Sequence, residues 1–193
     1  MTVDERAHKG RTLSTRSRGL LLLALTVLTA CGGSGNNPIG NPPTVSNPAT
    51  QGGRKLSFAY FQRCINPIFF TTIANNQCGA SGCHDSVNGT GGALRVTGSA
   101  TVVDLTNPAN TPDVVRTTDM YRNFYSAQGQ VLLATPDQSR LLIKPLVQGV
   151  LHGGGQIFAN TSDPNVQLME FWIRNPAPQG QDEFSFDPNA GTC

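Results

Sequence analysis

Short amphipathic segments, separated by stretches rich in glycine, proline and small polar residues, make up the chain from residue 54 onward. In the first segment, 56–64, a helical period brings Phe58, Phe61 and Ile65 to one side, and Pro67 starts a second short apolar run. The same period predicts further helices over about 112–125, 139–146 and 164–174.

Capping residues mark the ends of two of these helices. In Thr111-Pro112 and in Asp163-Pro164, a side chain that caps helices precedes a proline, which is favoured at the first helical position. Pro176 stops the last helix. Residues 85–111 are mainly Gly, Asn, Thr, Ser and Pro, so we expect an ordered loop there and few strands anywhere. The pattern predicts a mostly α, loop-rich fold with one small domain over 54–193.

The first thirty residues have the pattern of an export signal. A basic stretch precedes the apolar run 20–28, which is shorter than the roughly 20 residues that a membrane-spanning helix needs. Leu28-Thr29-Ala30-Cys31 resembles the bacterial lipobox, in which the cysteine is lipidated and becomes the first residue after cleavage. We therefore expect a lipoprotein signal peptide over 1–30 and a lipid on Cys31, because the flanks of this cysteine offer no core to bury it.

Residues 31–53 are expected to form a flexible tether between the lipid and the domain, since Gly, Asn, Pro, Ser and Thr dominate there. Several acyl chains on Cys31 would anchor the protein stably where one chain is marginal. Gly32 follows the cysteine, and by resemblance to Gram-negative lipoproteins this indicates the outer membrane, on the side that faces the periplasm.

The net positive charge of the whole chain comes from the predicted signal peptide, residues 1–30. Residues 1–30 contain 5 of the 14 basic and 2 of the 12 acidic residues, which leaves 9 basic and 10 acidic residues after cleavage. The mature chain is nearly neutral, so the basic whole-sequence pI is no argument for a nucleic-acid partner.

One motif carries the candidate chemistry: Cys78-Gly79-Ala80-Ser81-Gly82-Cys83-His84. Two thiols followed by a histidine are the residue types that attach haem c, the thiols as thioethers and the imidazole as an iron ligand. The common spacing is C-x-x-C-H, and here it is C-x4-C-H, which a regular helix would not accommodate. The intervening glycines allow a bulge, and the motif predicts one covalent haem c.

Two other uses of these side chains remain open. Cys78 and Cys83 are able to form a small disulfide in an oxidising compartment. Together with His84 and His152 they also have the chemistry of a zinc site.

The other ligand of the iron is expected to be His152, in Leu151-His152-Gly153-Gly154-Gly155, because a glycine loop can bring an imidazole against a ligand. The alternative is a loop histidine that hydrogen-bonds a carbonyl. Met120 is a further candidate, whereas Met169 lies in an apolar helix and fits core packing. Two histidine ligands predict a lower reduction potential than a histidine and a methionine.

Two cysteines are left over after these assignments, Cys64 and Cys193. A disulfide between them would close most of the domain into one loop, worth on the order of 4–5 kcal/mol from loop-closure entropy. We expect this disulfide, since an exported chain meets an oxidising medium.

The order of several short motifs over 57–176 resembles the cytochrome c-like domains found in exported proteins of planctomycetes and proteobacteria. The motifs are Ile65-Asn66-Pro67-Ile68-Phe69, Gly91-Gly92-Ala93-Leu94, Pro136-Asp137-Gln138-Ser139-Arg140-Leu141-Leu142, His152 to Gly155, and Phe171-Trp172-Ile173. The resemblance implies a cytochrome c-like domain, with haem attachment through Cys78, Cys83 and His84.

These expectations combine into an electron carrier of the cell envelope that exchanges electrons with redox partner proteins. We find no catalytic constellation in the sequence and expect no enzymatic residues. The alternative is a haem-free, disulfide-bonded envelope lipoprotein that acts as a binding module. A haem-based enzyme or gas sensor would require an open iron position.

Overall fold

A computed structural model describes residues 53–73, 75–189 and 191–193, all within one compact unit of the chain. The predicted signal peptide over 1–30, the lipidated Cys31 and the tether as far as residue 52 lie outside these described residues.

Helices and loops form the described part of the chain, where two isolated β-bridges occur but no strand. The prediction of a small, mostly α, loop-rich fold is confirmed. Over the same residues, no helix combines the length and the hydrophobicity needed to cross a bilayer. The elements are α1 (Phe58–Tyr60), η1 (Phe61–Ile65), α2 (Asn66–Phe70), α3 (Pro112–Val115), α4 (Asp119–Gln128), η2 (Pro136–Gln138), α5 (Arg140–Ile143) and α6 (Pro164–Arg174).

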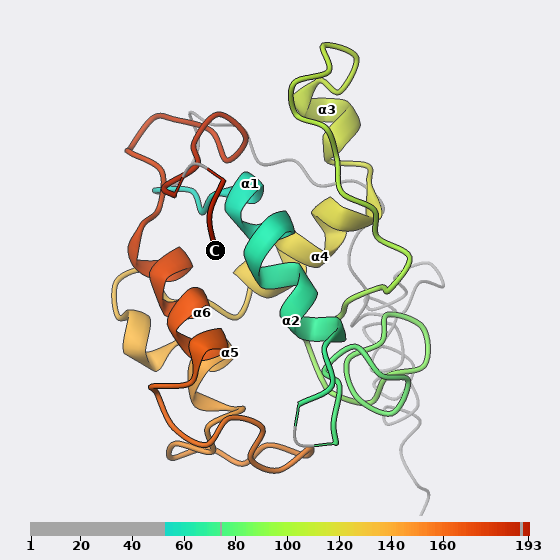
Figure 1. The fold of residues 1–193 in the computed structure, drawn as a ribbon, viewed down its shortest axis with the longest axis vertical. Coiled ribbons are helices and arrows are strands. Elements are labelled where there is room, and N and C mark those ends of the chain that lie inside the picture. Colours follow the sequence, from blue (N-terminus) through green and yellow to red (C-terminus); the bar gives the residue numbers. More distant parts are fainter. Residues whose placement is uncertain (1–52, 74, 190) are drawn as a thin grey trace, which may run out of the picture. The chain divides into compact units, whose positions relative to one another are not determined.

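The first three elements follow one another without a break and form one helical segment over 58–70 (Figure 1), where the sequence predicted two segments. This continuous helix is called the 58–70 coil below. Ser57 caps its start by accepting a hydrogen bond from the Tyr60 amide at 3.1 Å. The wide π turn of η1 leads into α2, and Pro67 lies in the first turn of α2.

The helix predicted over 112–125 is wrong as one element, because the chain breaks between α3 and α4. Thr118 is the cause: its hydroxyl accepts a hydrogen bond from the Tyr121 amide at 3.2 Å and donates one to the Val115 carbonyl at 2.7 Å. It therefore caps a new helix instead of continuing the old one. Val114, predicted on the apolar face, is 46 % exposed as a result.

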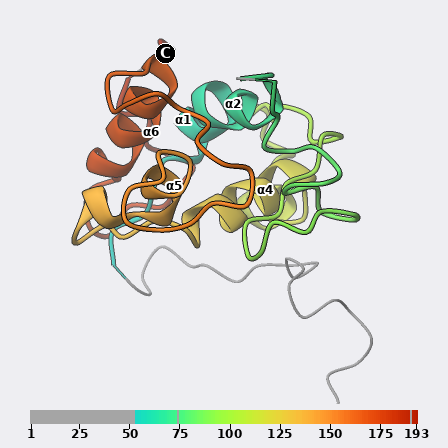
Figure 2. The same cartoon turned by 90° about the horizontal axis from the view of Figure 1, so that it is seen from below.

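Aromatic rings hold α4 and α6 against the 58–70 coil, which lies between them in Figures 1 and 2. The ring of Phe61 lies 5.4 Å, between centroids, from both Phe124 of α4 and Trp172 of α6. All three side chains are fully buried, and the Trp172 indole donates a hydrogen bond to the Ser57 carbonyl at 2.9 Å. The core thus fixes the coil from both sides.

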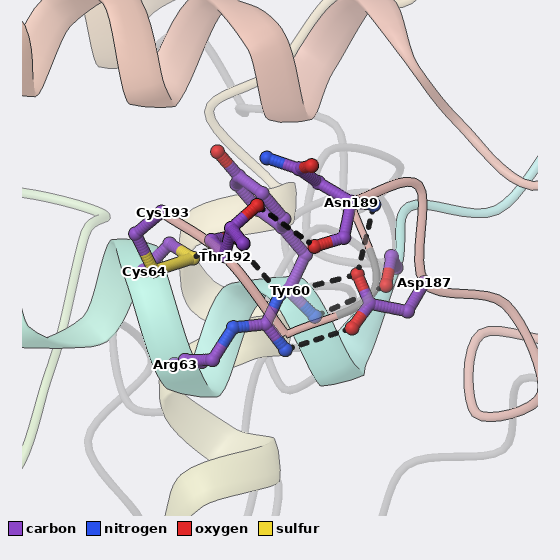
Figure 3. Close-up of a disulfide and its surroundings, with 8 residues drawn as sticks. Tyr60, Arg63, Cys64, Asp187, Asn189, Thr192 and Cys193 are labelled. Atoms are coloured by element: carbon purple, nitrogen blue, oxygen red, sulfur yellow. Dashed lines mark hydrogen bonds and ion pairs between the residues drawn. A yellow bond between two sulfur atoms is a disulfide. The ribbon is translucent and has the colours of Figure 1, made fainter.

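The last residues of the chain are tied to the 58–70 coil (Figure 3). Cys64 and Cys193 form the expected disulfide, across a sequence separation of 129. Beside it, Arg63 pairs with Asp187 at 2.7 Å and donates to the Thr192 carbonyl at 3.3 Å. The disulfide and the ion pair together fasten the C-terminal segment.

Candidate functional site

The cysteine motif begins at Cys78, eight residues after the end of α2, and folds as a series of tight turns. The Gly79 amide donates to the Phe69 carbonyl at 2.7 Å, which attaches the motif to the 58–70 coil. The His84 amide donates to the Cys78 carbonyl at 2.9 Å, so the first and last residues of the motif are brought together. The expected departure from a regular helix is present, since residues 78–84 form turns and a bend.

The His84 ring is held from the side of residues 91–96. Its Nδ1 lies 3.0 Å from the Leu94 carbonyl oxygen, and its own carbonyl accepts from the Val96 amide at 2.8 Å. Gly91 lies so close that an added Cβ would come within 2.6 Å of Nδ1 and 2.7 Å of the Cys83 carbonyl. Only glycine fits at this position without a shift.

The second histidine is held within a loop of its own. The His152 carbonyl accepts from the Gly155 amide at 2.9 Å, and Nδ1 of the ring lies 2.7 Å from the Gly155 carbonyl. Gly155 has a φ of 71°, in the left-handed region that glycine adopts readily. The third glycine of the motif therefore closes the turn that positions the imidazole.

Both histidines leave the same nitrogen available. A carbonyl oxygen only accepts hydrogen bonds, so each Nδ1 carries the hydrogen and each Nε2 has its lone pair in the neutral ring. Neither Nε2 has a hydrogen-bond partner among the described residues. Hydrogen-bonding Nδ1 to a carbonyl is the usual way in which proteins orient a metal-binding imidazole.

The rings of His84 and His152 form a pair across the site. Their centroids lie 6.2 Å apart and their planes differ by 11°. Two imidazoles that bind one metal ion from opposite sides, through bonds of about 2 Å, have ring centres about 6 Å apart. The spacing of the pair would therefore allow both rings to bind one metal ion.

Burial is the largest cause that lowers the pKa of His84. The hydrogen bond with the Leu94 carbonyl opposes this, and the charge of His152 adds to it. Burial therefore favours the neutral ring, the form that binds metals.

Two adjoining pockets meet at the histidine pair. The inner pocket has about 650 Å³ of space and the outer pocket about 950 Å³, open solvent included. They share Cys78, His84, Gly91, Lys144 and His152. The rest of the inner pocket is mostly apolar, apart from Gln130 and Arg140, and includes Ile68, Phe69, Leu141, Phe158 and Met169. Glycines, Cys83 and small polar residues line much of the outer pocket.

Both thiols of the motif are free, so the small disulfide considered above is not formed in this structure. Burial raises the pKa of Cys78 to about 11, and the neighbouring Cys83 thiol adds to this effect. Cys78 lines both pockets and Cys83 the outer one. The two sulfurs are therefore available at the rim of the space that the histidines border.

The predicted ligands that compete with His152 lie elsewhere or have another role. Met120 is buried in α4 and lines neither pocket. Met169 is buried, as its expected role in core packing requires, and it also lines the inner pocket. Arg140 and Lys144, which also line the inner pocket, were not predicted. Their spacing of four residues, just before the histidine loop, was the available signal.

No group of three or more His, Cys, Asp or Glu side chains is arranged to share a metal ion in residues 53–73, 75–189 and 191–193. A zinc site of the kind considered above would need such a group. A haem would not, because the porphyrin itself supplies four of the iron's ligands.

No family model, curated protein or solved structure matches this chain, and the cytochrome c-like identity therefore stays an expectation drawn from the sequence.

Proposed function

We propose that this protein is a monohaem c-type cytochrome that transfers electrons at the bacterial cell envelope. Haem c would supply a one-electron couple, the iron cycling between its ferrous and ferric states. The observation that carries the proposal is the parallel pair of His84 and His152, 6.2 Å apart, beside two free thiols.

The residues of the site have distinct roles in this proposal. Cys78 and Cys83 would each add their S–H across a vinyl group of the porphyrin, forming two thioether bonds with no leaving group. His84 and His152 would hold the iron through Nε2, with Nδ1 of each ring bonded to a carbonyl. Gly91 keeps the space beside His84 clear of a side chain.

The inner pocket supports electron transfer rather than catalysis at the metal. Most of its lining is apolar, and two imidazoles would leave no open iron position for a substrate. A change of redox state would then need little rearrangement, because each imidazole is held by its hydrogen bond to a carbonyl.

The envelope location is part of the same proposal. A lipid on Cys31 would anchor the domain to the outer membrane on the periplasmic side, where it would meet its redox partner proteins. Cys31→Ser should release the protein into the soluble periplasmic fraction with its haem content unchanged.

The central experiment is to express the full chain with a c-type maturation system and to denature the purified protein. We expect haem absorption and haem-linked mass to persist, because thioethers survive denaturation. A Cys78→Ala/Cys83→Ala variant is the matched control and should lose its haem on denaturation. Colourless wild-type protein with Cys78 and Cys83 disulfide-bonded would reject the electron carrier in favour of the haem-free binding module.

A further inference from the structure

Two cations at the ends of α5 border the inner pocket, Arg140 as its first residue and Lys144 as its C-cap. Arg140 and Lys144 are four residues apart, so they are neighbours on the helix surface, and the Lys144 amide donates to the Arg140 carbonyl at 3.2 Å. Lys144 is half-buried and also borders the outer pocket. Its charge contributes to the lowered pKa of His84.

These two cations have no counter-charge among the described residues. No Asp or Glu side chain of the described chain lines either pocket. By contrast, four other arginines pair with carboxylates, namely Arg63, Arg116, Arg122 and Arg174. The charges of Arg140 and Lys144 thus lie at the pocket with no carboxylate beside them.

Such an arrangement is unfavourable unless an anion joins it. Like charges four residues apart on a helix repel each other, and a half-buried ammonium loses hydration without gaining a partner. A carboxylate that entered the pocket would relieve both costs through charge-assisted hydrogen bonds. The pocket has the charge of a site for a ligand that is apolar over most of its surface and carries carboxylates.

We infer that Arg140 and Lys144 bind the two propionate carboxylates of the porphyrin and thereby set its orientation in the pocket. This inference rests on the proposed function. The thioethers at Cys78 and Cys83 would fix the vinyl edge of the porphyrin, and the two cations would fix the edge that carries the propionates. The role of both residues is positional, since neither contacts the iron.

The test compares a porphyrin that has two free carboxylates with one in which both are uncharged methyl esters. The full chain carrying Cys78→Ala and Cys83→Ala, which forms no thioethers, is titrated with iron protoporphyrin IX and with its dimethyl ester. We expect the free acid to bind more tightly than the ester. Arg140→Gln and Lys144→Gln should each weaken binding of the free acid about tenfold and leave binding of the ester unchanged.

Matched variants separate this effect from a general loss of structure. Lys144→Arg keeps the charge and should retain affinity for the free acid. Arg54→Gln removes an exposed cation that lines neither pocket, and should bind both porphyrins as its parent does. Equal affinity for acid and ester, or equal losses for both in Lys144→Gln, would overturn this inference alone. Failure of the parent chain to bind either porphyrin would overturn the proposed function as well.

Discussion

Nδ1 of His84 lies 3.0 Å from the carbonyl oxygen of Leu94, and this contact determines which nitrogen of the ring is free. His152 makes the equivalent contact with Gly155 at 2.7 Å, but within an exposed loop of four residues. The two histidines therefore make the same kind of hydrogen bond, but the carbonyls that hold them belong to different kinds of segment. His84 is held by a neighbouring segment, whereas His152 depends on its own turn.

The loss of His152 should leave the haem attached and open one iron position. His152→Ala is expected to convert a low-spin absorption spectrum to a high-spin one, while haem-linked mass stays unchanged. Met120→Leu is the control, because Met120 lines neither pocket, and it should remain low-spin. A low-spin spectrum in His152→Ala that Met120→Leu abolishes would show that methionine is the ligand.

The Cys78 thiol should react slowly in the folded, haem-free protein. Its pKa of about 11 leaves on the order of a thousandth of it as thiolate at pH 8. In a Cys83→Ser variant, alkylation by iodoacetamide should accelerate roughly tenfold per pH unit until the pH nears the raised pKa of Cys78. The same chain unfolded in urea should react faster at pH 8, and equal rates would contradict the burial of this thiol.

Gly91→Ala should damage the site more than its small size suggests. The new Cβ would lie 2.6 Å from Nδ1 of His84 and 2.7 Å from a backbone carbonyl, which forces a shift worth on the order of 1–3 kcal/mol. Gly82→Ala lies within the motif but meets open space, so its free energy of unfolding should change by less than about 0.5 kcal/mol. Urea unfolding of the two variants compares them, and equal stability would contradict the close approach.

Removal of the disulfide should lower the free energy of unfolding substantially. Cys64→Ala/Cys193→Ala opens a loop with a sequence separation of 129, at a cost of about 4–5 kcal/mol from loop-closure entropy. Urea unfolding measures the difference, with reduced wild-type protein as the control for the lost bond. An unchanged unfolding midpoint would mean that the C-terminal segment is held by its other contacts.

The Arg63–Asp187 pair should make stability depend on acid pH. The hydrogen bond from Arg63 is the main cause that lowers the pKa of Asp187 in the folded state. The stabilisation is therefore present above the unfolded pKa of about 3.9 and is lost as the pH falls through the folded value. Asp187→Asn should be less stable than wild type at pH 6, and the difference should shrink toward pH 2, as thermal unfolding would show.

Local signals in the sequence predict those parts of the fold that depend on local contacts. Asp163 followed by Pro164 predicts the start of α6, because a cap acts on amides two or three residues away. Thr118 also caps a helix, but it lies inside a continuous apolar pattern. The pattern by itself therefore predicts one helix where there are two. The continuous 58–70 coil also depends on a π turn that hydrophobic periodicity does not report.

The residues of the candidate site also differ in how far the sequence predicts them. Cys78, Cys83 and His84 lie together in the sequence, so their residue types predict haem attachment although their spacing departs from C-x-x-C-H. That His152 faces His84 is a product of the whole fold, and only the composition of its loop pointed to it. For Arg140 and Lys144 the sequence offers only their spacing of four residues, because an unpaired charge is defined by what surrounds it.

Glycine supplies five of the fourteen residues that line the outer pocket: Gly82, Gly91, Gly92, Gly153 and Gly154. At these positions only backbone would stand between a bound porphyrin and a protein that docks on this face. A redox partner could therefore bring its own cofactor near without first displacing bulky groups. The loops that permit the fold's tight turns would also shorten the path of the electron.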